Sequence, residues 1–385
     1  MRTTLKKDDS KSEELVRPSV DIKLLLLLLA LSFIGSLMIF SASTAYAETR
    51  FGDAFYFIKR QSVWLTLGII AMFAVSRVPP SRFQSLALPL FLCSLVLLAL
   101  VPLLGSEAGG AKRWLAIGPF TFQPSELSKT ALILLLSRYF AAPHVQDIMA
   151  KRGKKNVIYG IIYPILFFLS ITVLVLLEKH LSCIIILGCI TVSMIFLAGG
   201  NGRVLGTMCF GGGALVTVFA LSVEYTQRRI TIWRNPALYP RDGGWQTLQG
   251  LMAIGSGGLF GLGYGNSRLK HMYVSEPQND FIFTIVCEEL GLVGATVILV
   301  FFALLVLRGF AISGTISDRF SSLLGMGLTA KLAIQILLNI GVITNALPNT
   351  GISLPFFSYG GSSLVMLFAE MGILLSLSRE ANIRR

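Results

Sequence analysis

The amino-acid sequence predicts an all-α polytopic membrane protein with about ten transmembrane helices and one large external loop. Of its 385 residues, 54% are hydrophobic and only 14% are charged, and the mean hydropathy is +0.72. An ordinary soluble domain has about 25% charged residues. The apolar residues also fall into blocks of roughly 18 to 22, the length with which an α-helix crosses a bilayer.

Ten apolar blocks follow one another, and we predict that each is one membrane span. Their approximate ranges are 24–43, 61–77, 85–104, 124–142, 157–177, 181–199, 204–223, 281–307, 320–344 and 359–378. We expect one membrane domain over 23–379, preceded by a charged cytoplasmic tail at 1–22 and followed by a short cytoplasmic end at 380–385.

The distribution of lysine and arginine predicts the orientation. Ten spans place both termini on one side, and the short loops on that side are richer in basic residues. Because positive charge concentrates on the cytoplasmic side, we place both termini in the cytoplasm. The net charge of +13 then reflects topology and anionic lipid, and it requires no nucleic acid as a partner.

Known cofactor and hydrolase motifs are absent from the sequence. The five cysteines lie within or beside apolar blocks without metal-like spacing, and we interpret them as small hydrophobic residues. The three histidines, His144, His180 and His271, are unrelated in spacing. We therefore expect no organic cofactor.

Two segments between spans are predicted to be external. Residues 105–123 form a glycine-rich loop that carries Lys112, Arg113 and Trp114. Residues 224–280 form the largest segment outside the membrane. A short interfacial helix is expected within it, because Trp245 and later apolar residues share one helical face. A glycine-dense run follows, which permits either tight turns or a close approach of the backbone to a ligand or helix.

Polar residues interrupt two of the predicted spans. In the fourth, Glu126 and Lys129 are spaced i,i+3 and can pair. This is either a structural ion pair or a cation placed for a phosphate-bearing substrate. The ninth span carries a polar stripe, which we interpret as hydrogen bonding between helices: Lys331, Gln335 and Asn339.

A loop rich in proline and small residues, Asn339 to Ser363, separates the last two spans. Backbone amides left unpaired in lipid are costly, so this loop must be a shaped re-entrant or surface element that lines a polar cavity.

Asp280 ends the long external loop and begins the eighth span. Its position alone indicates an acid that caps a helix N-terminus. Together with the cations Lys112, Arg113 and Lys129, it also suits glycosyl transfer from a lipid diphosphate. The cations would hold the diphosphate, and the carboxylate would take the proton of an incoming sugar hydroxyl.

Four stretches of the chain, in order, resemble the SEDS family (shape, elongation, division and sporulation), the polytopic enzymes that polymerise bacterial cell-wall glycan strands. They are Gly110–Gly118 with Gln123–Glu126 and Lys129, Gly261–Ser267, Pro277–Phe283 with Glu288–Gly291, and the loop Asn339–Ser363. The resemblance extends over nearly the whole chain beyond residue 22. The residues of these stretches are most similar to those of the division and sporulation branch.

The resemblance implies the SEDS fold and a peptidoglycan glycosyltransferase that polymerises lipid II at the external face of the bacterial plasma membrane. It implies a class B penicillin-binding protein and other divisome or elongasome membrane proteins as partners. Asp280 matches the family's essential aspartate, as a base or as a ligand of a divalent cation (Mg²⁺ or Mn²⁺). The substrate-binding residues implied are Lys112, Arg113, Trp114, Gln123, Ser125, Glu126, Lys129, Glu276, Ser358 and Ser362.

Two departures from the family pattern stand out. Where the family often reads Pro-Asp-Leu-Gly-Thr, this chain has Lys179-His-Leu-Ser-Cys183, so that His180 replaces the usual acid. Asn345 stands where glycine is common, and asparagine tolerates a positive φ better than most residues.

The principal alternative is a flippase that moves lipid II across the membrane. It would concentrate its functional groups at mid-membrane, where Lys331 and Glu370 are predicted to lie. A non-catalytic scaffold for the septal machinery would leave Asp280 free to vary. We favour the enzyme because the sharpest group of acid and base side chains is predicted to be external.

Overall fold

The computed structural model describes residues 20–108, 111–118, 120–151, 154–202, 204–207, 224–239, 244–271, 273 and 276–381. Most of the predicted tail at 1–22, most of the predicted span at 204–223 and most of the predicted end at 380–385 lie outside these ranges.

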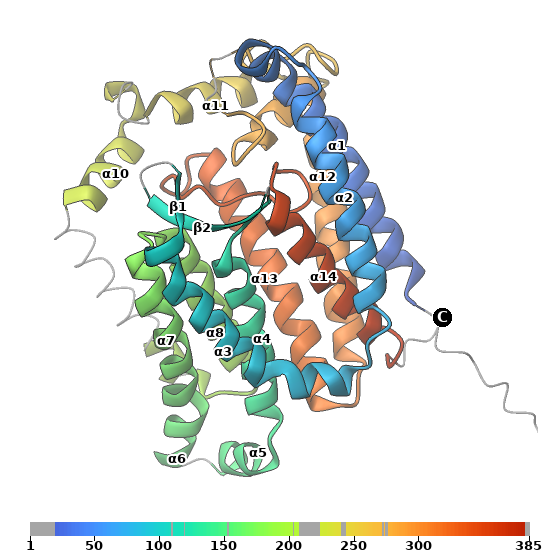
Figure 1. Ribbon diagram of the computed structural model, residues 1–385, viewed down its shortest axis with the longest axis vertical. Helices are drawn as coiled ribbons and strands as arrows, with labels where there is room; N and C mark the ends of the chain where they lie inside the picture. Colours follow the sequence, from blue (N-terminus) through green and yellow to red (C-terminus); the bar gives the residue numbers. More distant parts are fainter. Residues whose placement is uncertain are drawn as a thin grey trace, which may run out of the picture.

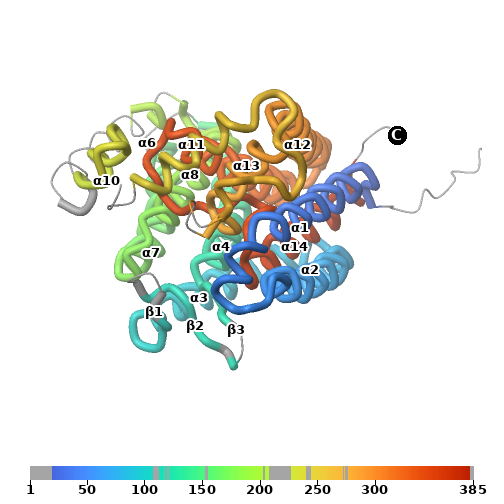
Figure 2. The backbone as a smooth tube through the Cα atoms, turned by 90° about the horizontal axis from the view of Figure 1, so that it is seen from above, coloured from blue at the N-terminus to red at the C-terminus, as the bar shows by residue number. Residues whose placement is uncertain are grey.

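Long helices run side by side in one bundle (Figure 1). They are α1 (Ile22–Phe51), α2 (Tyr56–Val75), α3 (Pro80–Leu104), α4 (Pro124–Ala141), α7 (Tyr163–Leu177), α8 (Leu181–Leu197), α12 (Ile282–Gly314), α13 (Arg319–Ile343) and α14 (Gly361–Leu377). From above, α13 lies near the middle (Figure 2), where it packs against α4, α8, α12 and α14.

The helices agree with the predicted membrane spans. Within the described residues, six are long and apolar enough to cross a membrane: α1, α2, α3, Lys155–Leu177, α12 and α13. The segment Lys155–Leu177 joins α6 (Lys154–Val157), a π-helical turn (Ile158–Ile162) and α7. The helices α8 and α14 are shorter but apolar. The other nine predicted spans each overlap a helix, and most of the span at 204–223 lies outside the described residues.

The two ends of the described chain meet at the lower end of the bundle in Figure 1. The backbone N–H of Asp21, which caps α1, donates to Ser378 Oγ after α14 (3.1 Å). The guanidinium of Arg308 near the end of α12 also pairs with the Asp21 carboxylate. The short helix α5 (Pro143–Ala150) lies at the same end. Both ends of the membrane domain therefore lie on one side, as an even number of spans requires.

The upper end holds the two segments that were predicted to be external. Residues 105–123, predicted as a loop, instead contain three antiparallel strands, β1 (Ser106–Ala108), β2 (Ala111–Ile117) and β3 (Phe120–Phe122). Cross-strand apolar pairs favour this arrangement, since Leu115 of β2 lies opposite Phe122 of β3. The long segment supplies α10 (Glu224–Arg234), a 3₁₀ turn (Pro236–Leu238) and α11 (Trp245–Ser256).

Helix α11 is the predicted interfacial helix. Its polar residues Thr247 and Gln249 are buried against the bundle, whereas Trp245 and Met252 are exposed. An exposed apolar face at this height suits the lipid–water boundary.

The glycine-dense run packs against a break in α12. At Gly291 the backbone adopts φ +67° and ψ −171°, which interrupts the helix after residue 290. The carbonyl of Glu288, freed by this break, accepts a hydrogen bond from Leu262 N (2.9 Å). A Cβ at Gly261 would lie 2.1 Å from Glu289 O, so only glycine allows this approach. The close approach to a helix is thus confirmed.

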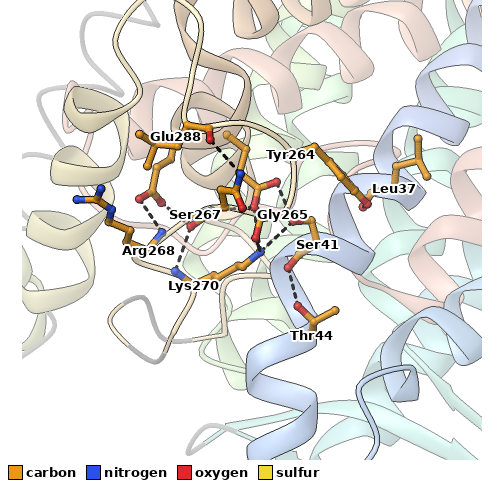
Figure 3. Close-up of polar contacts among 12 residues, drawn as sticks. Leu37, Ser41, Thr44, Tyr264, Gly265, Ser267, Arg268, Lys270 and Glu288 are labelled. Atoms are coloured by element: carbon orange, nitrogen blue, oxygen red, sulfur yellow. Dashed lines mark hydrogen bonds and ion pairs between the residues drawn. The ribbon is translucent and has the colours of Figure 1, made fainter.

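A buried polar cluster fixes the short first part of α12 (Figure 3). Lys270 Nζ bonds to Glu289 Oε1 (3.1 Å) and Ser41 Oγ of α1 (3.2 Å). The neighbouring Glu288 accepts bonds from the Ser267 hydroxyl and from Arg268 N. Lys270 therefore pairs with one of the two buried carboxylates, Glu289, and this latch ties residues 282–290 to α1.

Candidate functional site

A cavity of about 840 Å³ opens at the upper end of the bundle. Its walls come from α2, β2, α4, the α7–α8 corner, the segment before α12, α13 and the terminal loop. A second cavity of about 240 Å³ adjoins it and shares Arg113, His180, Ser182, Asp280 and Gly351 with it. Asp280 therefore stands at the junction of two cavities.

The backbone at Asp280 is held in place by α13. Asn339 Nδ2 donates to Asp280 O (2.9 Å) and to Ile352 O of the terminal loop (2.7 Å). The predicted polar stripe of α13 thus joins the acid to the loop opposite. The side chain of Asp280 is half-buried and faces the cavities.

Burial raises the pKa of Asp280 to about 6. A hydrogen bond from its own backbone N–H lowers the pKa, and the nearby Glu276 carboxylate raises it. A carboxyl group with this pKa is largely ionised at pH 7 and basic enough to accept a proton in a reaction.

Helix α4 brings an ion pair to the cavity floor. Glu126 Oε1 and Lys129 Nζ are 2.7 Å apart, as predicted, and both residues line the cavity. Gln123 lines it as well. Ser125 is fully buried behind the wall, where its hydroxyl contacts His180 Nδ1 (3.4 Å).

Two of the predicted cations, Lys112 and Arg113, are neighbours on strand β2 but have different surroundings. Arg113 lines both cavities, and its Nη2 donates to Lys179 O (2.9 Å). Its buried Nε has no hydrogen-bond partner in the described part of the chain and remains available to an anion. Trp114 lines the larger cavity. Lys112 is instead exposed, with Nζ 3.4 Å from Pro102 O, and lies outside both cavity linings.

The terminal loop closes the cavity on the opposite side. Ser358 lines the cavity, and its hydroxyl accepts from Leu354 N (2.7 Å). Ser362 is buried outside the lining, and its neighbour Ser363 faces the cavity. Glu276 is exposed outside the lining and accepts from Asn279 Nδ2 (2.7 Å).

Sequence reasoning missed Arg60 of α2. Its guanidinium lies over the Tyr56 ring (4.3 Å to the centroid), bonds to Tyr359 and lines the large cavity. A basic residue near the start of the second span was the available signal. Lys179 and Arg229, which were not predicted as site residues either, line the smaller cavity. Arginine side chains at both cavities favour an anionic ligand.

The residues around Asp280 restrict how a divalent cation could bind. Among the described residues, no three His, Cys, Asp or Glu side chains are grouped to hold a metal ion. Mg²⁺ is commonly bound by one or two carboxylates together with substrate phosphates. Asp280 therefore fits an ion shared with a diphosphate substrate, and it does not fit an ion held by protein ligands alone.

The chain is similar in sequence to cell-cycle and cell-wall proteins over nearly its full length. The family model FtsW/RodA/SpoVE, described as "Cell cycle protein", matches residues 22–383. Stage V sporulation protein E of Bacillus subtilis is 37% identical over 94% of this chain and 98% of its own length. "Probable peptidoglycan glycosyltransferase FtsW" of Geobacter sulfurreducens is 37% identical over 93% of this chain and 95% of its own.

Solved structures share the fold. A chain from "Structural coordination of polymerization and crosslinking by a peptidoglycan synthase complex" superposes with a TM-score of 0.79 at 29% identity, covering 94% of this chain and 98% of that chain. The rod shape determining protein RodA of Thermus thermophilus superposes with a TM-score of 0.69 at 30% identity, covering 95% and 98%.

Proposed function

The chain belongs to the FtsW, RodA and SpoVE family of cell cycle proteins, and we propose that it is a peptidoglycan glycosyltransferase of the division or sporulation branch that polymerises lipid II. One observation carries the proposal: Asp280 stands at the junction of two cavities that both contain Arg113. The direct test is glycan formation from lipid II by the purified protein with a transpeptidase partner.

The arrangement suits an inverting transfer between two lipid-linked sugars. Arg60, Arg113 and Lys129 would hold the donor diphosphate in the larger cavity and stabilise its charge as the bond from the sugar C1 to the phosphate oxygen breaks. Asp280 would take the proton of the acceptor hydroxyl, which enters from the smaller cavity and forms the new C–O bond. In the alternative role, Asp280 would hold a divalent cation, which would supply charge stabilisation to the diphosphate.

We assign the upper end of the bundle to the external face and both termini to the cytoplasm. The distribution of basic residues in short loops supports this orientation. A class B penicillin-binding protein is the proposed partner, supported by the similarity to a chain of a peptidoglycan synthase complex.

The position of the polar groups favours an enzyme over a flippase. The buried ion pair of Lys331 and Glu370 lies just below the cavity. Beneath it, most side chains in the described part of the lower bundle are apolar, among them Ile133, Leu136, Ile190, Met194, Leu324 and Leu328. The buried hydroxyls of Ser137, Thr191 and Thr329 bond to carbonyls of their own helices, so this layer offers a polar headgroup few hydrogen-bonding groups.

We expect Arg113→Met to lower kcat/KM for lipid II about ten- to a hundred-fold, because a hydrogen bond to a charged group contributes about 1.5–3 kcal/mol. The matched control is Lys112→Met, which removes the neighbouring positive charge outside the cavities. Steady-state polymerisation kinetics of both variants measure the difference. Equal losses in both would mean that only the general charge of the loop matters.

The pH dependence should follow Asp280. Since the carboxylate must be ionised to accept a proton, we expect polymerisation to rise with pH and to reach half of its plateau near pH 6, where the pKa lies. Glu276→Gln removes a charge that raises this pKa, so the rise should move to lower pH. A profile unchanged by Glu276→Gln would argue against titration of Asp280.

A further inference from the structure

The corner between α7 and α8, Glu178-Lys179-His180, lies beside the two cavities. His180 is half-buried and lines both. Lys179 adopts φ +52°, a backbone conformation that residues other than glycine rarely adopt. A tight turn therefore projects an imidazole into the site.

Three parts of the site clamp this corner. Arg113 Nη2 of β2 donates to Lys179 O (2.9 Å). The Ser182 hydroxyl donates to Thr350 O of the terminal loop. Ser125 Oγ of α4 lies 3.4 Å from His180 Nδ1. The ring is thus held by the same elements that carry the predicted substrate-binding residues, which fixes its direction.

The ring nitrogens have different surroundings. Ser125 also hydrogen-bonds to the Cys183 thiol. In the tautomer in which the serine hydroxyl donates to Nδ1, Nε2 carries the ring proton. No hydrogen bond from Nε2 to another described residue is present. In this tautomer the Nε2–H group is a donor without a partner among the described residues, in a ring that faces the cavities.

At neutral pH the corner presents no negative charge. Burial, then Arg113 and Lys129, lower the pKa of His180 to about 3, while Glu126 raises it. The Glu178 carboxyl is 2% exposed and has no hydrogen-bond partner in the part of the chain that the structure describes. Burial raises its pKa to about 8 against the opposing effect of Arg113. Because the His180 ring and the Glu178 carboxyl are both neutral at this pH, neither of them repels an anion.

We propose that His180 is a substrate-contacting residue whose Nε2–H donates to a phosphate oxygen of the lipid diphosphate, between Arg113 and Asp280. This inference rests on the proposed function, since it concerns the same site. The neutral imidazole adds a hydrogen bond to the leaving diphosphate. No bond is made or broken at the ring.

Two substitutions separate this contact from a structural role. His180→Gln places an amide N–H near the position of Nε2, whereas His180→Asn keeps a polar atom near Nδ1 for Ser125 and leaves the cavity without the donor. We expect the Gln variant to bind farnesyl diphosphate almost as the wild type does, and the Asn variant to bind it roughly ten- to a hundred-fold more weakly. Fluorescence of Trp64 and Trp114, which line the cavity, reports binding without turnover.

The control is His144→Asn, an exposed histidine at the opposite end of the bundle. Wild-type binding by the Asn variant, or a greater loss in the Gln variant, would overturn the proposal in favour of a structural bond to Ser125. Polymerisation by the wild-type protein is measured in parallel. Its absence, with the Gln and Asn variants still differing in binding, would refute the proposed function and not the contact.

Discussion

Replacing Asp280 with asparagine should abolish polymerisation of lipid II, with a loss of at least about a hundred-fold and up to about ten-thousand-fold in kcat, the range for a general base. Asparagine keeps the size of the side chain but cannot accept the proton. The backbone bond from Asn339 to Asp280 O is unaffected by the change, so the surrounding structure should persist. The measurement is glycan formation by the purified variant under single-turnover conditions.

Asp318→Asn is the matched control for this substitution. Asp318 caps α13 by accepting from Ser321 N (2.8 Å), and asparagine caps a helix about as well. We expect this variant to polymerise at the wild-type rate. A folded Asp280→Asn protein that still makes glycan would remove Asp280 from the mechanism.

Replacing Lys270 with methionine should destabilise the protein by about 3–5 kcal/mol, because it leaves the buried Glu289 carboxylate without its cation. Glu289 is fully buried, and Lys270 Nζ lies 3.1 Å from its Oε1. The latch holds residues 282–290, which follow Asp280 almost directly in the chain. Polymerisation should therefore fall together with the unfolding temperature. Thermal unfolding in detergent micelles measures the first effect.

Lys59→Met provides the comparison. Lys59 also pairs with a carboxylate, Asp53 (2.8 Å), but this pair is largely exposed to solvent. Exposed pairs contribute little to stability, so the unfolding temperature should not change. Equal unfolding temperatures for the two variants would show that the Lys270 latch does not hold the fold.

The sequence predicted those features that depend on local pattern. The spans followed from apolar length, and the pair of Glu126 and Lys129 followed from helical spacing. Asp280 was recognised because it ends an external loop among cations. Its position at the junction of two cavities depends on α13 and the terminal loop, which local pattern does not reveal.

Long-range packing explains what the sequence did not predict. Ser41 and Glu289 are separated by 248 positions yet share a hydrogen bond. Arg60 reaches the cavity only because α2 packs beside α14. Lys112 and Arg113 were treated alike because residues 105–123 were read as a loop. As a strand, β2 gives successive residues different surroundings, and the two cations are separated.

The central claim is best tested by one measurement in proteoliposomes that contain the wild-type protein, its penicillin-binding partner and labelled lipid II. Glycan strands should form, while lipid II in the opposite leaflet should stay there, because most side chains in the described lower bundle are apolar. Movement of lipid II between leaflets without any glycan product would contradict the enzyme and support a flippase.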